Sequence, residues 1–169
     1  MRKWFRLCEL SLVLKRVFGL LSTRSEHAQL KGVLPSGLEE RVDDDETLAR
    51  ILTTSRHFNA KMVVKPAAFM PNPKDRKKSV IRHAGNPSDE LWQIGREMLG
   101  ENVPMHGAAL VKAFYVRAAH LEVSSDEPPP RHANIENWPW PEGDPEEAKA
   151  RQMECAQQIA QHAKLLVRH

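Results

Sequence analysis

Residues 106–123 read HGAALVKAFYVRAAHLEV, and this stretch decides the fold class. The pattern fits two short strands around a helical turn, and it also fits one continuous helix. We favour the first interpretation, with Leu121 and Val123 in the second strand. This arrangement predicts an α+β domain, with a small, mostly antiparallel sheet packed by about three helices.

Two helices outside this stretch are predicted from their start signals. Ser88 in NPSDELWQIGREML (residues 86–99) suits a helix N-cap, because acidic residues occupy the next two positions. Asp144 is a second N-cap, followed by Pro145 at the first helical position, and predicts a helix to about Lys164. The apolar positions expected to face the core are Leu91, Ile94, Met98 and Leu99 in the first helix and Met153, Ala156, Ile159, Ala160 and Ala163 in the second.

The first half of the domain is predicted to contain a helix followed by a hairpin. The acidic run at residues 43–46 suits the positive end of a helix dipole and opens a helix through about Phe58. Residues 61–70 (KMVVKPAAFM) predict a strand, which Pro66 confines to an edge or a bulge. After a turn, residues 79–84 (SVIRHA) predict the returning strand.

An N-terminal appendage precedes this domain in the predicted organisation. Residues 4–21 spread apolar groups over a wide helix face, and residues 22–37 read as a linker. We therefore divide the chain into a basic amphipathic helix with its linker, residues 1–37, and a single α+β domain, residues 38–169. The helix could dock a partner or touch a membrane surface.

Composition predicts a folded protein of the cytoplasm. Hydrophobic residues make up 41% of the chain and charged residues 28%. Cys8 and Cys155 lie at opposite ends without a CxxC pair, which is neither a disulfide framework nor a zinc motif. No run of about 18 uncharged apolar residues exists, so no membrane span is predicted. The apolar N-terminal stretch imitates a signal peptide, but Glu9, Lys15 and Arg16 interrupt it.

Charge is arranged in blocks, although the formal net charge is only +3. Residues 61–84 hold seven basic and one acidic side chain, a net +6, whereas residues 126–147 hold one basic and seven acidic, a net −6. Such blocks either neutralise each other inside the fold or present separate faces to partners. The first block contains a basic turn formed by Lys74, Arg76, Lys77 and Lys78. This turn is a candidate contact for nucleic acid, and a solvated hairpin tip is the alternative.

Four Arg-His dipeptides are the main candidates for chemistry, since the sequence has no phosphate-binding loop, GxSxG, HExxH or CxxC signature. Arginine binds phosphate through paired donors, and histidine transfers protons near neutral pH. The candidate catalytic residues are His57, His106 and His132, and the candidate phosphate-binding residues are Arg56, Arg82 and Arg131. Adjacent residues on a strand point to opposite faces, so separate structural roles are the alternative. The histidines lack the short spacing of a metal site, and we predict no metal or other cofactor.

Residues 124–143 predict a long loop that contains the stretch PPPRHANIENWPWP. Trp138 and Trp140 are candidate anchors for a protein partner, because preformed proline segments and tryptophan suit interfaces. Alternatively, both tryptophans plug the edge of the core while His132 bonds a backbone carbonyl.

The order of LARILTTSRHF, VVKPAAFMP, SVIRH, LWQIG, HGAAL and DEPPPRHANIENWP resembles a group of short, uncharacterised bacterial proteins. The resemblance covers residues 44–141, a little over half of the chain. That group is associated with mobile-element and phage-defence gene neighbourhoods. The resemblance implies a bacterial accessory protein and transfers no catalytic residue.

Two functional interpretations follow from these observations. The first is a non-enzymatic accessory or binding module that contacts a protein partner and nucleic acid. The missing catalytic signatures, the separated charges and the aromatic, proline-rich loop favour it. The second is a small phosphate-handling enzyme, such as a nuclease or a nucleotide-transferring effector, built from the Arg-His pairs.

Overall fold

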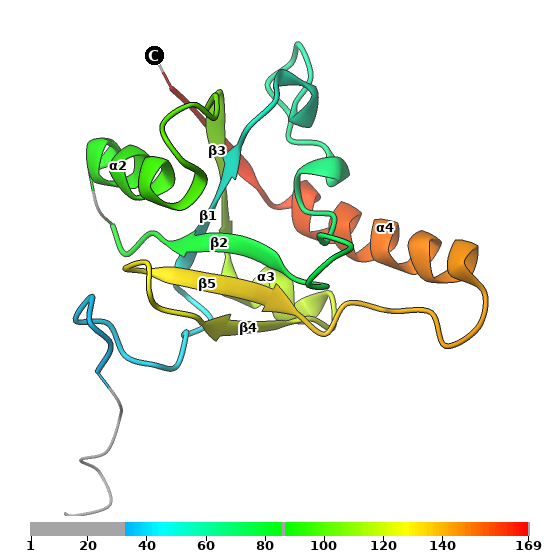
Figure 1. Ribbon diagram of the computed structural model, residues 1–169. Helices are drawn as coiled ribbons and strands as arrows, with labels where there is room; N and C mark the ends of the chain where they lie inside the picture. The colour runs from blue at the N-terminus through cyan, green and yellow to red at the C-terminus, as the bar shows by residue number, and fades with distance from the viewer. Residues whose placement is uncertain (1–32, 86, 169) are drawn as a thin grey trace, which may run out of the picture. The chain divides into compact units, whose positions relative to one another are not determined.

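Six antiparallel strands form one sheet in the computed structural model, which describes residues 33–85 and 87–168. In the spatial order β4-β5-β2-β1-β3-β6, the strands are β4 (Glu122–Ser125), β5 (His132–Glu136), β2 (Lys78–Arg82), β1 (Thr47–Leu52), β3 (Gly107–Lys112) and β6 (Lys164–Val167). The described helices are α2 (Ser88–Leu99), α3 (Ala113–Ala118) and α4 (Pro145–Gln161), with short 3-10 turns η2 (Ser55–His57) and η3 (Pro66–Ala68). The predicted α+β class is confirmed (Figure 1).

The junction between β1 and β2 is short. Strand β1 pairs with β3 along its whole length, whereas it pairs with β2 only at Leu48 and Ala49. Beyond Ala49 the two strands diverge, and in Figure 1 they cross at a steep angle. The sheet therefore opens beside Arg50, the next residue of β1.

The sheet buries apolar side chains on both faces. Leu48 and Leu52 of β1 belong to the core formed with α3, α4 and η3, whereas Ala49 and Ile51 belong to the core covered by α2. Helix α2 approaches the sheet closely at Gly95, where an added Cβ would lie 3.2 Å from Cδ1 of Ile51. A larger residue at this position would need the side chains of Met105 and Ile51 to shift by a few tenths of an ångström.

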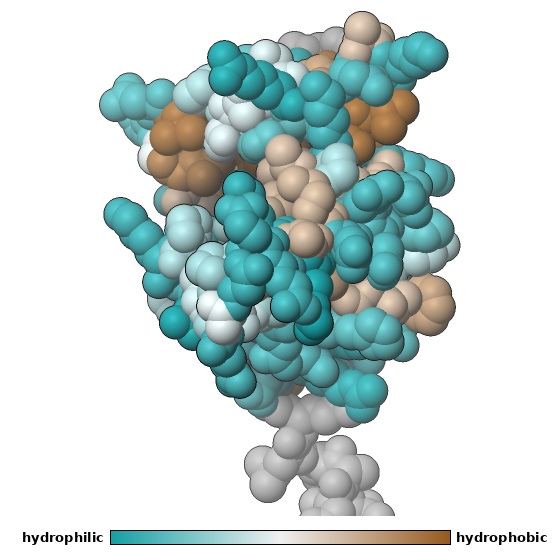
Figure 2. Space-filling model, turned by 90° about the vertical axis from the view of Figure 1, so that its right-hand side faces the viewer, coloured by the Kyte–Doolittle hydropathy of each residue, from teal (hydrophilic) through white to brown (hydrophobic). Residues whose placement is uncertain are grey.

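Large apolar side chains that remain exposed are scattered over the described surface. Met62 and Val63 lie between η2 and η3, Phe114 lies on α3, and Met153 lies on α4. Figure 2 shows that the face turned toward the right of Figure 1 is mainly hydrophilic, with small, separate apolar patches. This face therefore suits recognition by polar and charged groups more than docking of a large apolar surface.

The interpretation of residues 106–123 as strand, short helix and strand is confirmed, because β3, α3 and β4 follow one another in this order. The alternative of one continuous helix is wrong. Val116 of α3 is buried in the core, as are Leu121 and Val123. Burial of these side chains holds the short helix against the core where the chain passes from β3 to β4.

The N-cap predicted at Asp144 is confirmed, whereas the N-cap predicted at Ser88 is wrong, because Ser88 is the first helical residue. Helix α2 begins at Ser88, with Pro87 in the cap position, and no side chain caps it. Asp144 caps α4, because its side chain accepts a hydrogen bond of 2.9 Å from the backbone N–H of Glu146. Pro145 is the first residue of α4, as predicted, and its missing N–H costs nothing there.

The predicted helix over residues 43–58 is wrong, because this region contains β1 and η2. A strand that is buried on both faces needs a nearly continuous apolar run, which local periodicity does not separate from a helix. The acidic residues of this region form ion pairs instead of capping a helix. Asp44 pairs with Arg117, and Glu46 pairs with Arg82.

Other predicted elements also differ from the structure. Residues 61–70 contain η3 and no regular strand, since Pro66 opens a turn in which its carbonyl oxygen accepts a hydrogen bond of 2.9 Å from Phe69. The predicted loop over residues 124–143 contains β5, whose central residues are buried. The last helix ends at Gln161, before the predicted end, and β6 follows.

The end of the predicted linker is attached to the domain. The backbone N–H and the hydroxyl of Ser36 donate hydrogen bonds of 3.0 and 2.5 Å to the carboxylate of Glu127. Val33 and Glu39 form an isolated antiparallel bridge. The predicted helix over residues 4–21 lies outside the described residues. Within the described ranges, no helix combines the length and the apolar character needed to cross a membrane.

Candidate anion-binding site

Three basic side chains approach one another where β1 and β2 separate. Arg50 comes from β1, Lys78 begins β2, and His57 ends η2. Burial, and after it the positive charge of Arg50, lowers the pKa of Lys78 from 10.5 to about 7. The pKa of His57 is also lowered, first by burial and then by the charges of Arg50 and Lys78. The three groups therefore share one electrostatic environment.

Arg50 is fixed in the opening of the sheet by neutral acceptors. Its Nε donates to the carbonyl oxygen of Ala68 at 3.3 Å, and its Nη1 donates to the carbonyl oxygen of Ser79 at 3.1 Å. Burial lowers the pKa of Arg50 from 12.5 to about 10. No carboxylate of the described residues forms an ion pair with this guanidinium. Since a guanidinium has five N–H donors, three are left for other acceptors.

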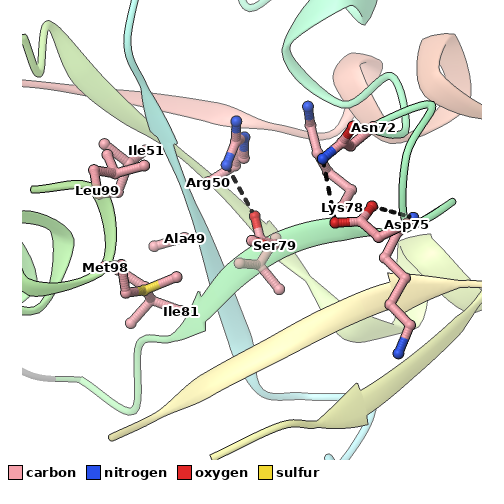
Figure 3. A pocket seen from close by; sticks show the side chains of 12 residues that line it. Ala49, Arg50, Ile51, Asn72, Asp75, Lys78, Ser79, Ile81, Met98 and Leu99 are labelled. Atoms are coloured by element: carbon pink, nitrogen blue, oxygen red, sulfur yellow. Dashed lines mark hydrogen bonds between the residues drawn. The ribbon is translucent and has the colours of Figure 1, made fainter. Parts of the chain in front are cut away.

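A cavity of about 210 Å³ adjoins Arg50, bounded by β1, β2, the turn before β2 and the C-terminal end of α2. Its polar side is formed by Arg50, Asn72, Asp75, Lys77, Lys78 and Ser79, and its apolar side by Ile51, Ile81, Met98 and Leu99. Figure 3 shows the apolar group on one side of Arg50 and the group around Lys78 on the other. The cavity is therefore amphipathic, with basic groups at its polar end.

Asp75 is the one carboxylate among the described residues that line this cavity. Its Oδ2 accepts a hydrogen bond of 3.2 Å from Nδ2 of Asn72, and its Oδ1 accepts one of 3.1 Å from the backbone N–H of Lys77. The charge of Asp75 raises the pKa of Lys78, but by less than burial and Arg50 lower it. The polar end of the cavity keeps an excess of positive charge.

His57 contains a buried ring nitrogen with no hydrogen-bond partner. Its Nδ1 has none among the described atoms, although its backbone carbonyl accepts a bond of 2.7 Å from the N–H of Lys65. An unpaired buried polar atom costs about 1–3 kcal/mol. His57 is therefore a candidate for a functional role beside Arg50 and Lys78.

The basic turn predicted at Lys74, Arg76, Lys77 and Lys78 is divided between several environments. Lys77 pairs with Glu136 at 2.7 Å, and the guanidinium carbon of Arg76 lies 4.7 Å from the ring centre of Trp140. Lys74 is exposed. Lys78 lines the cavity and has no carboxylate in ion-pair range among the described residues. Part of the block of positive charge is thus neutralised by the acidic block, and part is left for a ligand.

Arg82, a candidate phosphate ligand, is instead committed to the core. Its side chain is 1% exposed, and its Nε and Nη2 donate to the carboxylate of Glu46 at 2.8 and 2.6 Å. Its Nη1 donates to the carbonyl oxygen of Glu39 at 2.5 Å and to the hydroxyl of Ser125 at 2.9 Å. A buried guanidinium that is bonded in this way has no donor facing solvent for a ligand.

Trp138 and His132 have the geometry of the packing interpretation, whereas Trp140 is half-buried and lies against Arg76 outside the core. Trp138 is buried, and its Nε1 donates to the carbonyl oxygen of Ile135 at 3.0 Å. Nδ1 of His132 lies 2.8 Å from the carbonyl oxygen of Asp126. In both contacts a side chain of this segment bonds a backbone carbonyl oxygen nearby in the sequence, which holds the segment against β5.

The sequence candidates are not gathered at one place. His132 pairs with Ile81, at the opposite end of β2 from Lys78. Arg131, next to His132, places its Nε 3.5 Å from a carboxylate oxygen of Glu90 on α2. Arginine and histidine candidates from β5 therefore lie apart from the cavity.

Arg56 and His106 are exposed and do not line the cavity. The backbone N–H of His106 donates to the carbonyl oxygen of Leu52 at the end of β1 that leads to η2. Of the predicted site residues, Lys77 and Lys78 line the cavity; His57 does not line it, although the charges of Arg50 and Lys78 act on its ring. Arg50 completes the group and was not among the predicted residues; its signal in the sequence is a single charge within the apolar run LARIL.

No protein-family model matches this chain, and no curated protein or solved structure matches it significantly. Across residues 33–85 and 87–168, no three His, Cys, Asp or Glu side chains are grouped in a way that could hold a metal ion. The groups at the site that can act on a ligand are the basic side chains of Arg50, Lys78 and His57. Such a group can bind an anion, and phosphate has the most acceptor oxygens among common anionic groups of biological ligands.

Proposed function

We propose that this chain is a non-enzymatic binding module that holds a phosphate-bearing polyanion, nucleic acid in particular, within a bacterial multi-component system. The observation that carries this proposal is the placement of Arg50 and Lys78 in one cavity without a carboxylate ion pair among the described residues. The bacterial setting comes from the sequence resemblance alone.

The electrostatic cost of burying two positive charges favours an anionic ligand. Removing two positive charges from water is unfavourable unless an opposite charge compensates them. Here Arg50 has carbonyl acceptors, and Lys78 forms no ion pair with Asp75, which is already bonded to its own turn. A bound phosphate would supply the missing negative charge and would accept charge-assisted hydrogen bonds from both side chains.

Exposed lysines near the cavity extend this basic region. Lys61 and Lys65 lie on the segment between η2 and η3, and Lys74 lies on the turn before β2. The backbone of Lys65 is bonded directly to that of His57, so this segment borders the site. Lysines at such positions would contact neighbouring phosphates of a strand without reading its sequence.

A protein partner is the second contact that we propose. Met62 and Val63 are 48% and 53% exposed on the segment that is bonded to His57 through Lys65, and the backbone of Met62 is held at a positive φ of 62°. A bulky residue pays for that conformation, and costs of this kind are common at functional positions. These two side chains are our candidate contact for the partner protein.

The phosphate-handling enzyme is the alternative, and one observation favours it. The pKa of Lys78 is lowered to about 7 and that of His57 is lowered by burial, and such shifts suit acid–base chemistry on a bound phosphate. An enzyme would lose turnover in His57→Ala while it still bound its ligand. A binding module would show no turnover to lose.

The test is the binding of labelled oligonucleotides to the full chain over a range of salt concentrations. We expect the logarithm of the affinity to fall linearly with the logarithm of salt, and Lys78→Gln to flatten the slope by about 1. Lys149→Gln, on the exposed face of α4, is the matched control and should leave the slope unchanged. Absence of binding at about 50 mM salt contradicts the proposal.

A further inference from the structure

The cavity beside Arg50 has two chemically different sides. Lys78, Asn72 and Asp75 lie at its polar end, and Met98 and Leu99 from the C-terminal end of α2 lie at its apolar end (Figure 3). A ligand that fills such a cavity carries an anionic group and an apolar group close together. A bare phosphate or a sugar-phosphate backbone alone would use only half of the lining.

The donors at the polar end match a phosphate monoester better than a carboxylate. Arg50 keeps three N–H donors beyond its bonds to Ala68 and Ser79, and a lysine ammonium supplies three more. A terminal phosphate offers three oxygens for these donors, whereas a carboxylate offers two. The fixed guanidinium is also preorganised, because both of its carbonyl acceptors belong to the backbone.

The size of the cavity limits the apolar group. A cavity of about 150 Å³ holds a benzene ring, so the volume of about 210 Å³, which includes the polar end, leaves room for no more than one ring system against the apolar side. A base pair is too large for it. Ile51 and Leu99 provide apolar walls, and the thioether of Met98 makes favourable contacts with aromatic rings.

We propose that the cavity binds a single nucleotide unit, with its phosphate on Arg50 and Lys78 and its base against Met98 and Leu99. This inference rests on the proposed function and names the part of the polyanion that the cavity holds. This nucleotide unit is either a free mononucleotide or the 5′-terminal nucleotide of a strand. Phosphates further along a strand would reach the exposed lysines outside the cavity.

The test is calorimetric titration of the full chain with AMP, adenosine, inorganic phosphate and a pair of oligonucleotides that differ only in a 5′-phosphate. We expect AMP to bind at least about 10-fold more tightly than adenosine or inorganic phosphate, because only AMP uses both ends of the cavity. Lys78→Gln and Leu99→Ser should each weaken AMP binding by about 10-fold or more, and Lys149→Gln should not change it. Met98→Gln replaces Leu99→Ser if the latter loses its cooperative thermal transition.

The outcomes separate this inference from the proposed function. Tighter binding of the 5′-phosphorylated oligonucleotide assigns the unit to a strand end, whereas AMP binding with no effect of the 5′-phosphate assigns it to a free mononucleotide. AMP that binds no better than inorganic phosphate overturns the inference. If oligonucleotides bind with a salt dependence but AMP does not bind, the cavity assignment fails and polyanion binding stands. If neither AMP nor oligonucleotides bind, both proposals fail.

Discussion

The guanidinium of Arg50 donates a hydrogen bond of 3.1 Å to the carbonyl oxygen of Ser79, across the gap where β1 and β2 separate. In a regular sheet this carbonyl would accept from a backbone N–H of the neighbouring strand. A side chain replaces that ladder bond here. The same guanidinium therefore closes the opening of the sheet and presents positive charge to the cavity.

Replacement of Arg50 should affect stability and binding together. We expect Arg50→Gln to lower the free energy of unfolding by about 1–3 kcal/mol, because the carbonyl oxygens of Ala68 and Ser79 lose their partner. Binding of phosphate-bearing ligands should also be lost. Urea denaturation and titration with AMP measure the two effects, and Arg96→Gln on the exposed side of α2 is the control. Full AMP affinity in a folded Arg50→Gln protein contradicts the assignment.

Stability should depend on the protonation of Lys78. Because the folded-state pKa is lowered to about 7 from 10.5, the unfolded chain binds more protons at this position between these two pH values. The free energy of unfolding should therefore rise with pH across this window, as the buried charge is removed. Arg50, His57 and Asp75 face the same amine, so the comparison is made with Lys78→Met in the same background. The variant should be more stable than the natural chain near pH 7, and this difference should shrink toward pH 10.5. Equal stability of the two proteins at all pH values would contradict the burial of a charged Lys78 in the folded protein.

Arg82 should behave as a structural residue. Arg82→Met leaves the carboxylate of Glu46 without its partner, and breaking a buried pair costs about 3–5 kcal/mol. Combining Arg82→Met with Glu46→Leu should recover at least about 1 kcal/mol of this loss, because no unpaired charge remains. Chemical denaturation of both variants provides the comparison. A loss below about 1 kcal/mol in the single variant would return Arg82 to the candidate ligands.

His132 should contribute to stability and not to binding. Since its Nδ1 contacts the carbonyl oxygen of Asp126, we expect His132→Ala to cost about 1–3 kcal/mol. Its position at the far end of β2 from Lys78 predicts unchanged affinity for AMP and oligonucleotides. Trp138→Ala, which removes a buried indole, should cost about 3–5 kcal/mol and serves as the stability reference. Lost ligand binding in a stable His132→Ala protein would revive the site built from Arg-His pairs.

Elements with local signals were predictable from the sequence. Asp144 followed by Pro145 marks a helix start in any context, and α4 begins there. Strand β1 lacked such a signal, because its two buried faces give an apolar run without a period of two. Strand β5 was hidden among prolines and tryptophans, and it depends on pairing with β2 and β4.

The candidate site depends on contacts that are distant in sequence. Lys78 was visible as part of a basic turn, but its burial follows from the packing of β1 and β2 around it. Arg50 acquires its role because β2 leaves β1 after two paired positions, and no local pattern encodes that divergence. The sequence therefore supplied two members of the group, His57 and Lys78, without the relationship between them.

The most direct test of the central claim is to measure the pKa of Lys78 with and without AMP. NMR of the lysine side chains in the full chain gives this pKa. Because phosphate binds the protonated amine, the account predicts that AMP raises this pKa from about 7. A pKa of Lys78 that stays the same at saturating AMP, or a Lys78 pKa at its ordinary value of 10.5 without ligand, would contradict it.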